Sequence, residues 1–380
     1  MNKTVYLLAL GIFGLVMTEF SVIGILPEVA VHFQVPIEKA GWLLSVFALV
    51  VAITAPFSTL LTARINRKTM LVSALLVFTL SNILAALSPD FITMLISRIL
   101  PALLHPIFWA VATALAASSV DRKQSPRAVS IVYAGLSVAT VIGVPAASWL
   151  AHRFGWEAAF YANAIVNALS MLCMMIWMPD KPVDGARQQA QLALLRVPQQ
   201  WVNLLIALII IAGLFSTYGY FAQYVQQISH MSGAETSLML FIFGLTGLAG
   251  NYVMGIMLTR SVEGTARVSF LALIAVHIAL YFWAGHYVFM FILVAVWGFV
   301  HTGNFLLGGV FSMKDAGNAT EFATSLFASF ANLGVFTGTL LGGAVIASNG
   351  VRDTVWVSVL FLTLALAGTW VKVGRSSERT

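Results

Sequence analysis

The first long apolar segment of the sequence contains one carboxylate, Glu19, in the stretch GLVMTEFSVIGILPE (residues 14–28). The other residues from Val5 to Leu26 are apolar, aromatic or small. An ionised carboxylate at the centre of a bilayer costs about 2.5–3.5 kcal/mol on insertion scales. Membrane proteins keep such a group where it serves an ion, a proton or a counter-charge, so Glu19 is the first candidate for chemistry.

Arg98 is the other formally charged residue well inside an apolar segment. At about 1.5 Å per residue, Glu19 and Arg98 both lie about 20 Å from the same side of a hydrocarbon core of about 30 Å. We therefore expect the two side chains to pair if their segments are neighbours. The pair would either lock two helices together or allow Glu19 to exchange a proton, and the sequence leaves both interpretations open.

Further candidates are polar residues beside aromatic ones. His105 lies seven residues after Arg98, near the same helix face. STYGYFAQYVQQ (216–227) and VWGFVHTGNF (296–305) combine aromatic rings with neutral hydrogen-bonding groups, which suits an uncharged, partly apolar or sugar-like ligand. For any single residue, a hydrogen bond between helices is the more common role. The polar residues within apolar segments are Tyr133, Asn163, Asn167, Tyr218, Tyr220, Gln223, Tyr224, Asn251, His277, His301, Asn304 and Asn332.

Other kinds of chemistry find little support. The sequence has no glycine-rich phosphate loop with a lysine, and its histidines are scattered without metal-ligand spacing. No cluster of acids and bases suggests an enzyme active site. We expect a protein that is not an enzyme and that needs no cofactor or metal.

The composition decides which elements carry these residues. Of the 380 residues, 60% are hydrophobic and 9% are charged, which indicates an all-α integral membrane protein embedded in a lipid bilayer. The single cysteine, Cys173, excludes an internal disulfide framework. Twelve apolar segments are expected, near 5–27, 41–62, 69–87, 91–117, 128–149, 158–178, 200–225, 235–258, 267–284, 287–310, 323–347 and 354–371.

The polar stretch between the sixth and seventh segments divides the chain into two halves. We expect a six-helix bundle over 1–178, a cytoplasmic linker over 179–199, and a second six-helix bundle with a short cytoplasmic tail over 200–380. The fifth segment ends in GVPAASWLAHRFG (143–155) and the eleventh in GTLLGGAVIASNG (338–350), with glycine first and last in both. Matching positions in two halves suit the parallel repeats of transporters.

The basic residues predict the orientation. If the connections alternate sides, three basic residues lie on one side: Lys39, Arg153 and Arg352. The others outside the spans share the opposite side with both termini: Lys3, Arg64, Arg67, Lys68, Arg122, Lys123, Arg127, Lys181, Arg187, Arg196, Arg260, Arg267, Lys314, Lys372, Arg375 and Arg379. By the positive-inside rule both termini are cytoplasmic. The net charge of +6 therefore reflects topology and does not indicate nucleic-acid binding.

The sequence resembles the major facilitator superfamily, in particular the twelve-span drug:proton antiporter-1 group and its arabinose/sugar-efflux-like branch. MTEFSVIGILPEVA (17–30) looks like the first span of that branch, and SRILPALLHPIFWAVATALA (97–116) resembles its fourth. Arg98 falls at the family's arginine, and His105, Phe108 and Trp109 fall at its His-x-x-Phe-Trp positions. GLSVATVIGVPAASWLAHRFGW (135–156) is similar to the antiporter motif of the fifth span, with Gly135, Gly143 and Pro145 at the motif positions.

Two regions depart from the family pattern. The loop TLLTARINRKTM (59–70) keeps Arg64, Arg67 and Lys68, but Ala63 stands at the aspartate position and Thr59 and Asn66 stand at glycine positions. A latch that uses the aspartate is therefore not expected in this chain. In the fifth span, Ser148 replaces the glycine after the proline, and Glu157 stands where arginine is common.

The resemblance implies two bundles that rock about a central cavity lined by spans 1, 4, 7 and 10. It implies a monomeric antiporter of the bacterial inner membrane, which exports a drug, sugar or nucleoside in exchange for protons through Glu19 and Arg98. Substrate would contact His105, Phe108, Trp109, Tyr218, Gln223, His301 and Asn304. The alternatives are a proton-coupled uptake symporter and a non-transporting sensor or scaffold. The sensor would require a soluble domain or long tail, and the longest stretch outside the spans is the short linker.

Overall fold

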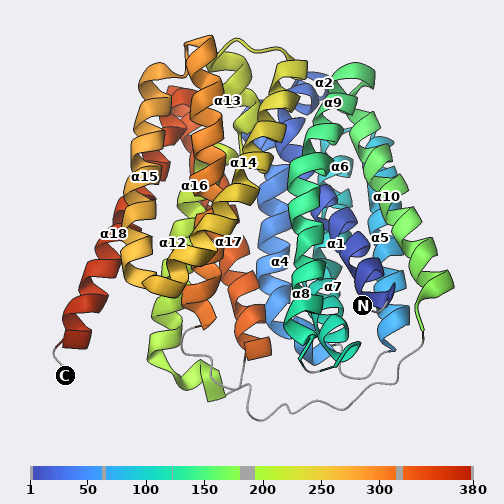
Figure 1. The fold of residues 1–380 in the computed structure, drawn as a ribbon. Helices are drawn as coiled ribbons and strands as arrows, with labels where there is room; N and C mark the ends of the chain where they lie inside the picture. The colour runs from blue at the N-terminus through green and yellow to red at the C-terminus, as the bar shows by residue number, and fades with distance from the viewer. Residues whose placement is uncertain (1–2, 62–65, 122, 180–192, 314–319, 378–380) are drawn as a thin grey trace.

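The computed structural model describes residues 3–61, 66–121, 123–179, 193–313 and 320–377. These residues form helices and short turns without a β-strand, and twelve helical spans are long and apolar enough to cross a membrane. The predicted all-α fold with twelve spans is confirmed (Figure 1). Both ends of the described chain lie at the same face of the helix assembly, which we call the termini face, and we call the opposite face the far face.

Four of the first six spans are broken or distorted helices, or begin with a separate short helix. Their elements are α1 (Lys3–Phe20), η1 (Ser21–Gly24), α2 (Leu26–His32), α3 (Ile37–Ala40), α4 (Trp42–Leu61), α5 (Arg67–Ala86), α6 (Phe91–Ser97), α7 (Ile99–Ser118), α8 (Ser125–Val138), η2 (Ala139–Gly143), α9 (Val144–Phe154) and α10 (Trp156–Trp177). The uninterrupted spans are α5 and α10. The η2 segment is a π-helix, a form that often marks functional sites.

The remaining spans are more regular. Their elements are η3 (Ala193–Arg196), α12 (Pro198–Tyr218), α13 (Phe221–Ile228), α14 (Gly233–Arg260), α15 (Val262–Trp283), α16 (Tyr287–Met313), α17 (Thr320–Asn349), η4 (Val351–Asp353) and α18 (Thr354–Ser377). Residues 180–192 of the predicted linker lie outside the described residues, and the last residues of its range already belong to η3 and α12.

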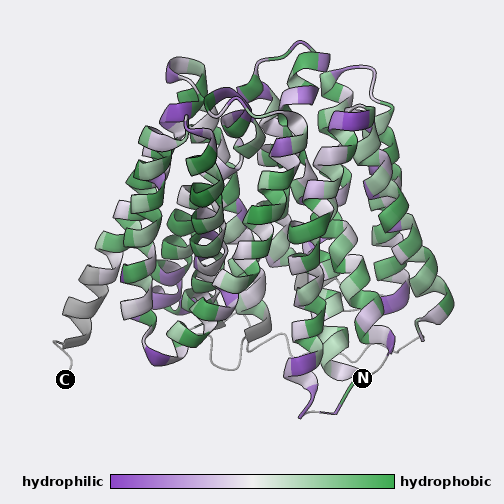
Figure 2. Ribbon diagram, turned by 45° about the horizontal axis from the view of Figure 1, so that its top comes forward, coloured by the Kyte–Doolittle hydropathy of each residue, from purple (hydrophilic) through white to green (hydrophobic). Residues whose placement is uncertain are grey.

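Hydrophilic residues gather near the helix ends, as Figure 2 shows. Asn66 and Asp90 cap α5 and α6, since their side chains accept hydrogen bonds from first-turn N–H groups. Ser232 and Glu235 form a reciprocal capping box at the start of α14. These caps satisfy N–H groups that the helices leave unpaired at the edge of the apolar layer.

The two halves pack their helices in the same pattern. In the first half α1 packs against α8 and α10, and α5 packs against α10; in the second half α12 packs against α17 and α18, and α15 packs against α18. These are the corresponding spans of each half. The repeated pairing supports an internal repeat of six spans.

Four turns mark the repeat at residue level. The non-glycine residues with positive φ are Gln34 (51°) after span 1 and His230 (53°) after span 7, which lie 196 residues apart. Gly155 (98°) after span 5 and Gly350 (96°) after span 11 lie 195 residues apart. The two glycines are those that end the matching sequence segments, and both occupy a backbone region that favours glycine.

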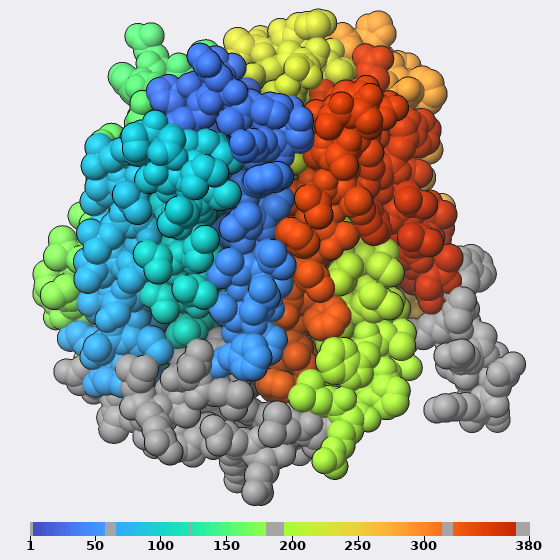
Figure 3. Space-filling view, turned by 180° about the vertical axis from the view of Figure 1, so that it is seen from behind, coloured from blue at the N-terminus to red at the C-terminus, as the bar shows by residue number. Residues whose placement is uncertain are grey.

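Two seams join the bundles. Along α4 and α17, which lie side by side in Figure 3, the hydroxyls of Ser45 and Thr339 share a hydrogen bond of 2.7 Å, and Ser329 donates to the carbonyl of Ala52 at 2.5 Å. Along α9 and α14, the Ser237 hydroxyl donates to the Ser148 hydroxyl, and Ser148 donates to the carbonyl of Gly24, each at 3.0 Å. Both seams extend into the far half of the molecule, where they hold the bundles together.

Tyr220 closes the space between spans 2, 7 and 11 near the far face. Its ring lies against Gly41 and Gly343, where a Cβ atom at either glycine would overlap the tyrosine side chain. The Tyr220 hydroxyl donates to the carbonyl of Thr339 at 2.9 Å. The ring fills the volume that the two glycines leave open.

The close approach of α14 and α16 gives a test of the packing. A Cβ at Gly250 would overlap the carbonyl oxygen of Phe299, whereas no atom lies within 4 Å of a Cβ at Gly255 on the same helix. We expect Gly250→Ala to lower the unfolding free energy by about 1–3 kcal/mol, because the backbones must separate. Gly255→Ala should leave it unchanged or slightly higher, since alanine is the better helix former. Thermal unfolding in detergent measures both, and equal midpoints would contradict the packing.

Candidate functional site

Glu19 lies one residue before the end of α1, and its carboxylate contacts a histidine. Its Oε2 atom is 3.1 Å from Nε2 of His105, on α7, and both residues are 5% exposed. The indole N–H of Trp109, one turn further along α7, points at the same Nε2 at 3.3 Å. Nε2 carries either a proton or a lone pair. With a proton it donates to the Glu19 carboxylate, and with a lone pair it accepts from the Trp109 indole.

Arg98 occupies the break between α6 and α7 and is 2% exposed. Its guanidinium donates to the carbonyl oxygens of Thr18 (2.8 Å), Glu19 (3.1 Å) and Leu43 (3.3 Å). The ring of Phe47 lies below it, with the guanidinium carbon 4.7 Å from the ring centroid. One side chain therefore joins spans 1, 2 and 4.

The expectation that the Arg98 and Glu19 side chains form an ion pair is wrong, because other atoms of the two residues meet. The two residues do meet at the same depth, but the guanidinium binds the Glu19 carbonyl and the carboxylate contacts His105. The physical reason is that α1 ends at Phe20, so carbonyls in its last turn are available to a cation. The planar guanidinium reaches several such acceptors at once.

Neutral side chains fix the end of α1 on its other side. The Thr18 hydroxyl accepts hydrogen bonds from the amides of Asn82 and Asn167, each at 3.0 Å, and donates to the carbonyl of Gly14. Asn82 belongs to α5 and Asn167 to α10. The helix segment that carries Glu19 is thereby held by side chains of three neighbouring spans, 3, 4 and 6.

A cavity of about 250 Å³ lies between the bundles, beside Glu19 and His105. Its walls come from α1, α7, α8, α16 and α17, that is, from spans 1, 4, 5, 10 and 11. The residues of spans 4 and 5 that line it lie in the halves nearer the termini face. Spans 1, 4 and 10 therefore line the cavity as expected, while spans 5 and 11 take the place expected for span 7.

The cavity walls offer aromatic and neutral polar groups. Trp109 and Tyr133 face each other across 5.2 Å between ring centroids. Asn332 donates to the carbonyl of Ala328, and its Oδ1 atom accepts no hydrogen bond from the described residues. Glu19 is the one aspartate or glutamate among the lining residues, which include no lysine or arginine. Such walls suit a neutral solute that offers hydroxyl groups and an apolar face.

The structure separates the predicted substrate residues into four groups. His105 and Trp109 line the cavity. Phe108 is fully buried in the first bundle, with its ring against Gly11, and is not a lining residue. Gln223 lines a different pocket, at the far face.

The other three predicted substrate residues are used within the second bundle. Tyr218 and His301 are buried in a cluster of aromatic rings, 4.8 Å apart between ring centroids. Asn304 accepts from Ser269 at 3.0 Å and donates to the carbonyl of Val300 at 2.9 Å, so the protein already bonds both ends of its amide.

Most other cavity residues were not assigned from the sequence. Among the polar ones, Tyr133 and Asn332 are two of many polar residues in the spans, and Thr113 carries no motif. A usable signal was present for Tyr133, because Trp109 and Tyr133 belong to the spans that carry the two recognised motifs. For Asn332 the sequence offers none, because its neighbourhood is set by the packing of α17.

The motif glycines of the fifth span permit close helix contacts. A Cβ at Gly135 would overlap the carbonyl of Ala9 on α1, and Gly143 ends the π-helix just before Pro145. The π-helix packs its own backbone, at Thr140, against Gly244 of α14. The fifth span is thus in close contact with span 1 of its own bundle and with span 8 of the other.

The basic motif residues lie at the termini face. Arg67 and Lys68 form the first turn of α5, behind the Asn66 cap. Arg64 and Ala63 lie outside the described residues.

The chain is similar to known transporters over most of its length. The model of the Major Facilitator Superfamily matches residues 8–321. The "Inner membrane transport protein YdhP" of Escherichia coli O157:H7 is 35% identical over 349 residues, which cover 91% of this chain and 90% of the relative. A "Probable sugar efflux transporter" of Helicobacter pylori (strain P12) is 29% identical over 363 residues, 95% of this chain and 93% of the relative.

Solved structures show the same fold at low sequence identity. The nucleoside transporter NupG, as its D323A mutant, superimposes with a TM-score of 0.74 at 14% identity, covering 98% of each chain. A bacterial homologue of the human lysosomal transporter Spinster, in an inward-facing and unoccupied conformation, gives 0.77 at 16% identity and 96% coverage of each chain.

The Arg98 geometry predicts a large loss of stability from a conservative change. In Arg98→Lys one ammonium group replaces a fork that reaches carbonyls from two spans, and each charged hydrogen bond lost costs about 1.5–3 kcal/mol. We expect a clear drop in the thermal unfolding midpoint, larger than that of Glu19→Gln, which leaves the carbonyl bonds in place. The control is Arg127→Lys, at an exposed arginine of the same bundle. If the Arg98 and Arg127 variants unfold together, the three carbonyl bonds do not stabilise the fold.

Proposed function

The chain belongs to the Major Facilitator Superfamily of membrane transporters, and we propose that it exports a small neutral molecule across the bacterial inner membrane in exchange for protons. The observation that carries the proposal is the contact between Glu19 and His105 at the wall of the cavity between the bundles. A carboxylate and an imidazole in contact share one or two protons as a unit. The pair is therefore the proposed proton-binding site.

Competition for Glu19 supplies the coupling. A ligand hydroxyl in the cavity donates a hydrogen bond to the ionised carboxylate, which is an acceptor on both oxygens. A proton on Glu19 removes the charge and occupies one oxygen, so the ligand contact weakens. Substrate and proton then bind in turn, as an antiporter requires. Arg98 keeps the end of α1 in place and is a positioning residue, since its donors are directed to backbone carbonyls.

The topology and the relatives support a direction of transport. By the positive-inside rule we take the termini face as cytoplasmic, so that the cavity would lie in the cytoplasmic half and load substrate from inside. The seams through Ser148 and Tyr220 close the opposite side. Rocking of the bundles would then open the far side, with the π-helix of span 5 as a point of rearrangement. The efflux transporters of Helicobacter pylori favour export over the alternative of uptake.

The substrate class follows from the cavity walls. The rings of Trp109 and Tyr133, the phenyl rings beside them and the amide of Asn332 suit a molecule with a ring and several hydroxyl groups. The absence of lysine and arginine among the lining residues disfavours an anion. A sugar fits this description best, in keeping with the sugar efflux transporters among the relatives, and a nucleoside is the second candidate.

Glu19→Gln is expected to uncouple transport from protons. The amide keeps the shape and a hydrogen-bond acceptor but does not ionise, so substrate counterflow in proteoliposomes should persist while pH-gradient-driven transport is lost. Substrate-induced proton release should vanish, as measured with a pH-sensitive dye and a panel of sugars and nucleosides. Asp121→Asn, at an exposed acid of the termini face, is the control and should behave as the unmodified protein. Undiminished gradient-driven transport by Glu19→Gln would rule out its proton role.

Alanine variants of Asn332 and Asn304 distinguish a residue that contacts substrate from one that stabilises the fold. Asn332→Ala should raise the apparent KM by a factor of about 2–12, equivalent to one lost hydrogen bond of about 0.5–1.5 kcal/mol, with little change in the unfolding midpoint. Asn304→Ala should lower the midpoint and leave KM near its original value, because its amide bonds only to protein groups. The reverse pattern in transport and thermal unfolding assays would return the substrate site to the second bundle.

A further inference from the structure

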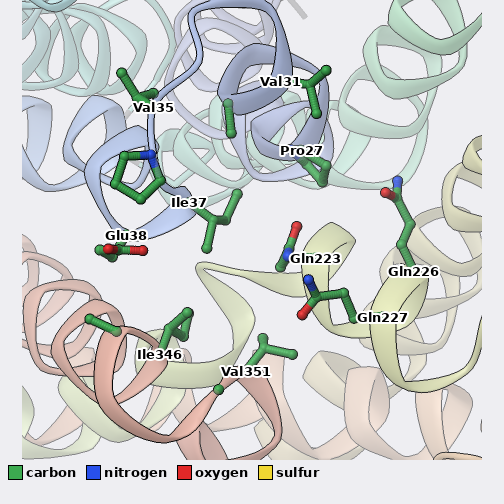
Figure 4. A pocket seen from close by; sticks show the side chains of 14 residues that line it. Pro27, Val31, Val35, Ile37, Glu38, Gln223, Gln226, Gln227, Ile346 and Val351 are labelled. Atoms are coloured by element: carbon green, nitrogen blue, oxygen red, sulfur yellow. The ribbon is translucent and has the colours of Figure 1, made fainter.

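A second pocket opens at the far face, between the two bundles. It has a volume of about 760 Å³ and is lined by α2, the following turn, α3, α13, the end of α17 and η4. Figure 4 shows Gln223 and Gln227 of α13 and Glu38 of α3 around one common space. We call this space the far vestibule. It is within the size range of small-molecule sites.

The far vestibule holds polar groups that the protein does not use. Gln226 is bonded to the carboxylate of Glu28. The amides of Gln223 and Gln227 have no hydrogen-bond partner among the described residues. Two free amides and a carboxylate within one pocket provide donors and acceptors for a ligand with several hydroxyl groups.

The composition of the walls narrows the ligand class. The lining residues include no lysine, arginine or histidine, so an anion would meet only the negative charge of Glu38. They include no aromatic ring either, so a flat apolar drug or an organic cation finds no stacking or cation–π surface. Short aliphatic side chains such as Val31 and Ile346 supply the remaining walls. This combination suits a neutral polyhydroxylated molecule.

The far vestibule lies on the outer side of the Tyr220 closure. A Cβ at Gly343 would touch the Tyr220 hydroxyl on one side and the Cβ of Glu38, at 3.4 Å, on the other. A molecule that leaves the central cavity when this closure opens would therefore enter the space beside Glu38 and Gln223. The two pockets lie in series, separated by the closure.

We propose that the far vestibule is a second substrate site, which binds the neutral polyhydroxylated solute after it passes the Tyr220 closure; this rests on the export proposed above. Gln223 and Gln227 bond its hydroxyl groups, and Glu38 accepts from them. The site uses neither Glu19 nor His105. Binding there is therefore independent of the proton-binding pair.

Cysteine protection tests the site directly. Val31, which lines the far vestibule and is 79% exposed, is replaced by cysteine in full-length protein that carries Cys173→Ala. In detergent, lactose and arabinose should slow maleimide labelling of Val31→Cys, whereas citrate and tetraphenylphosphonium should not. His286→Cys, at an exposed turn of the far face outside the vestibule, is the matched control and should label at an unchanged rate.

A second set of variants identifies the binding groups. Adding Gln223→Leu and Gln227→Leu should raise the sugar concentration for half-protection at least tenfold, because leucine keeps the bulk and removes the amides. Adding Glu19→Gln should leave protection unchanged. Protection that survives both leucines, or that only tetraphenylphosphonium gives, would overturn the proposal.

Parallel transport assays separate this inference from the proposed function. Sugar transport without protection of Val31→Cys at any tested concentration overturns the far vestibule site and leaves the exporter intact. Protection that the leucine variants abolish, in a protein that transports none of the sugars, supports the site and counts against the proposed export.

Discussion

The guanidinium of Arg98 is the interaction on which the arrangement around the cavity depends. A buried cation in a bilayer needs acceptors for its N–H groups, and helices in their regular parts have none to offer. The end of α1 at Phe20 and the break at Arg98 bring the cation to the last-turn carbonyls of Thr18 and Glu19, and its Nε also donates to the carbonyl of Leu43 at the start of α4. With these carbonyls occupied, the Glu19 side chain turns to His105 and the cavity instead of to Arg98. The need of Arg98 for carbonyl acceptors therefore accounts both for the helix breaks around it and for the position of the Glu19 side chain.

The sequence predicted the fold well because each span is a local property of about twenty residues. Depth along a helix is also local, which is why Glu19 and Arg98 were correctly placed at one level. The sequence could not predict that Arg98 bonds the carbonyl of Glu19 and not its carboxylate, since this depends on the residue at which α1 ends. Phe108 failed to reach the cavity for a similar reason: Gly11 on a neighbouring span leaves room for its ring inside the bundle. Asn332 and Tyr133 became cavity residues only through the contact between bundles.

The barrier between the two pockets is made mostly of neutral groups. Serine and threonine hydroxyls at Ser45, Thr339, Ser148 and Ser237 bridge the bundles, and no ion pair joins the bundles within the described residues. Such hydrogen bonds in membranes are modest, about 0.6 kcal/mol on average, so a seam of this kind opens at low cost. In this respect Ser148, which replaces a family glycine, adds a bond to the barrier without adding charge. A charged latch is not needed to hold the far side closed.

The residue spacing of the repeat relates the Tyr220 closure to a corresponding junction in the other half of the chain. Counting back 196 residues from Tyr220 leads to Gly24, and the glycines that receive the ring, Gly41 and Gly343, correspond to Ser237 and Ser148. One junction is therefore built as a tyrosine between two glycines, and its counterpart as a glycine against Ser148, which in turn accepts from Ser237. The two halves divide the same volume differently among three corresponding positions. Sequence change at either junction is then bound to be compensatory: a side chain gained at one position of the trio must be matched by one lost at another, and the two halves are no longer interchangeable there.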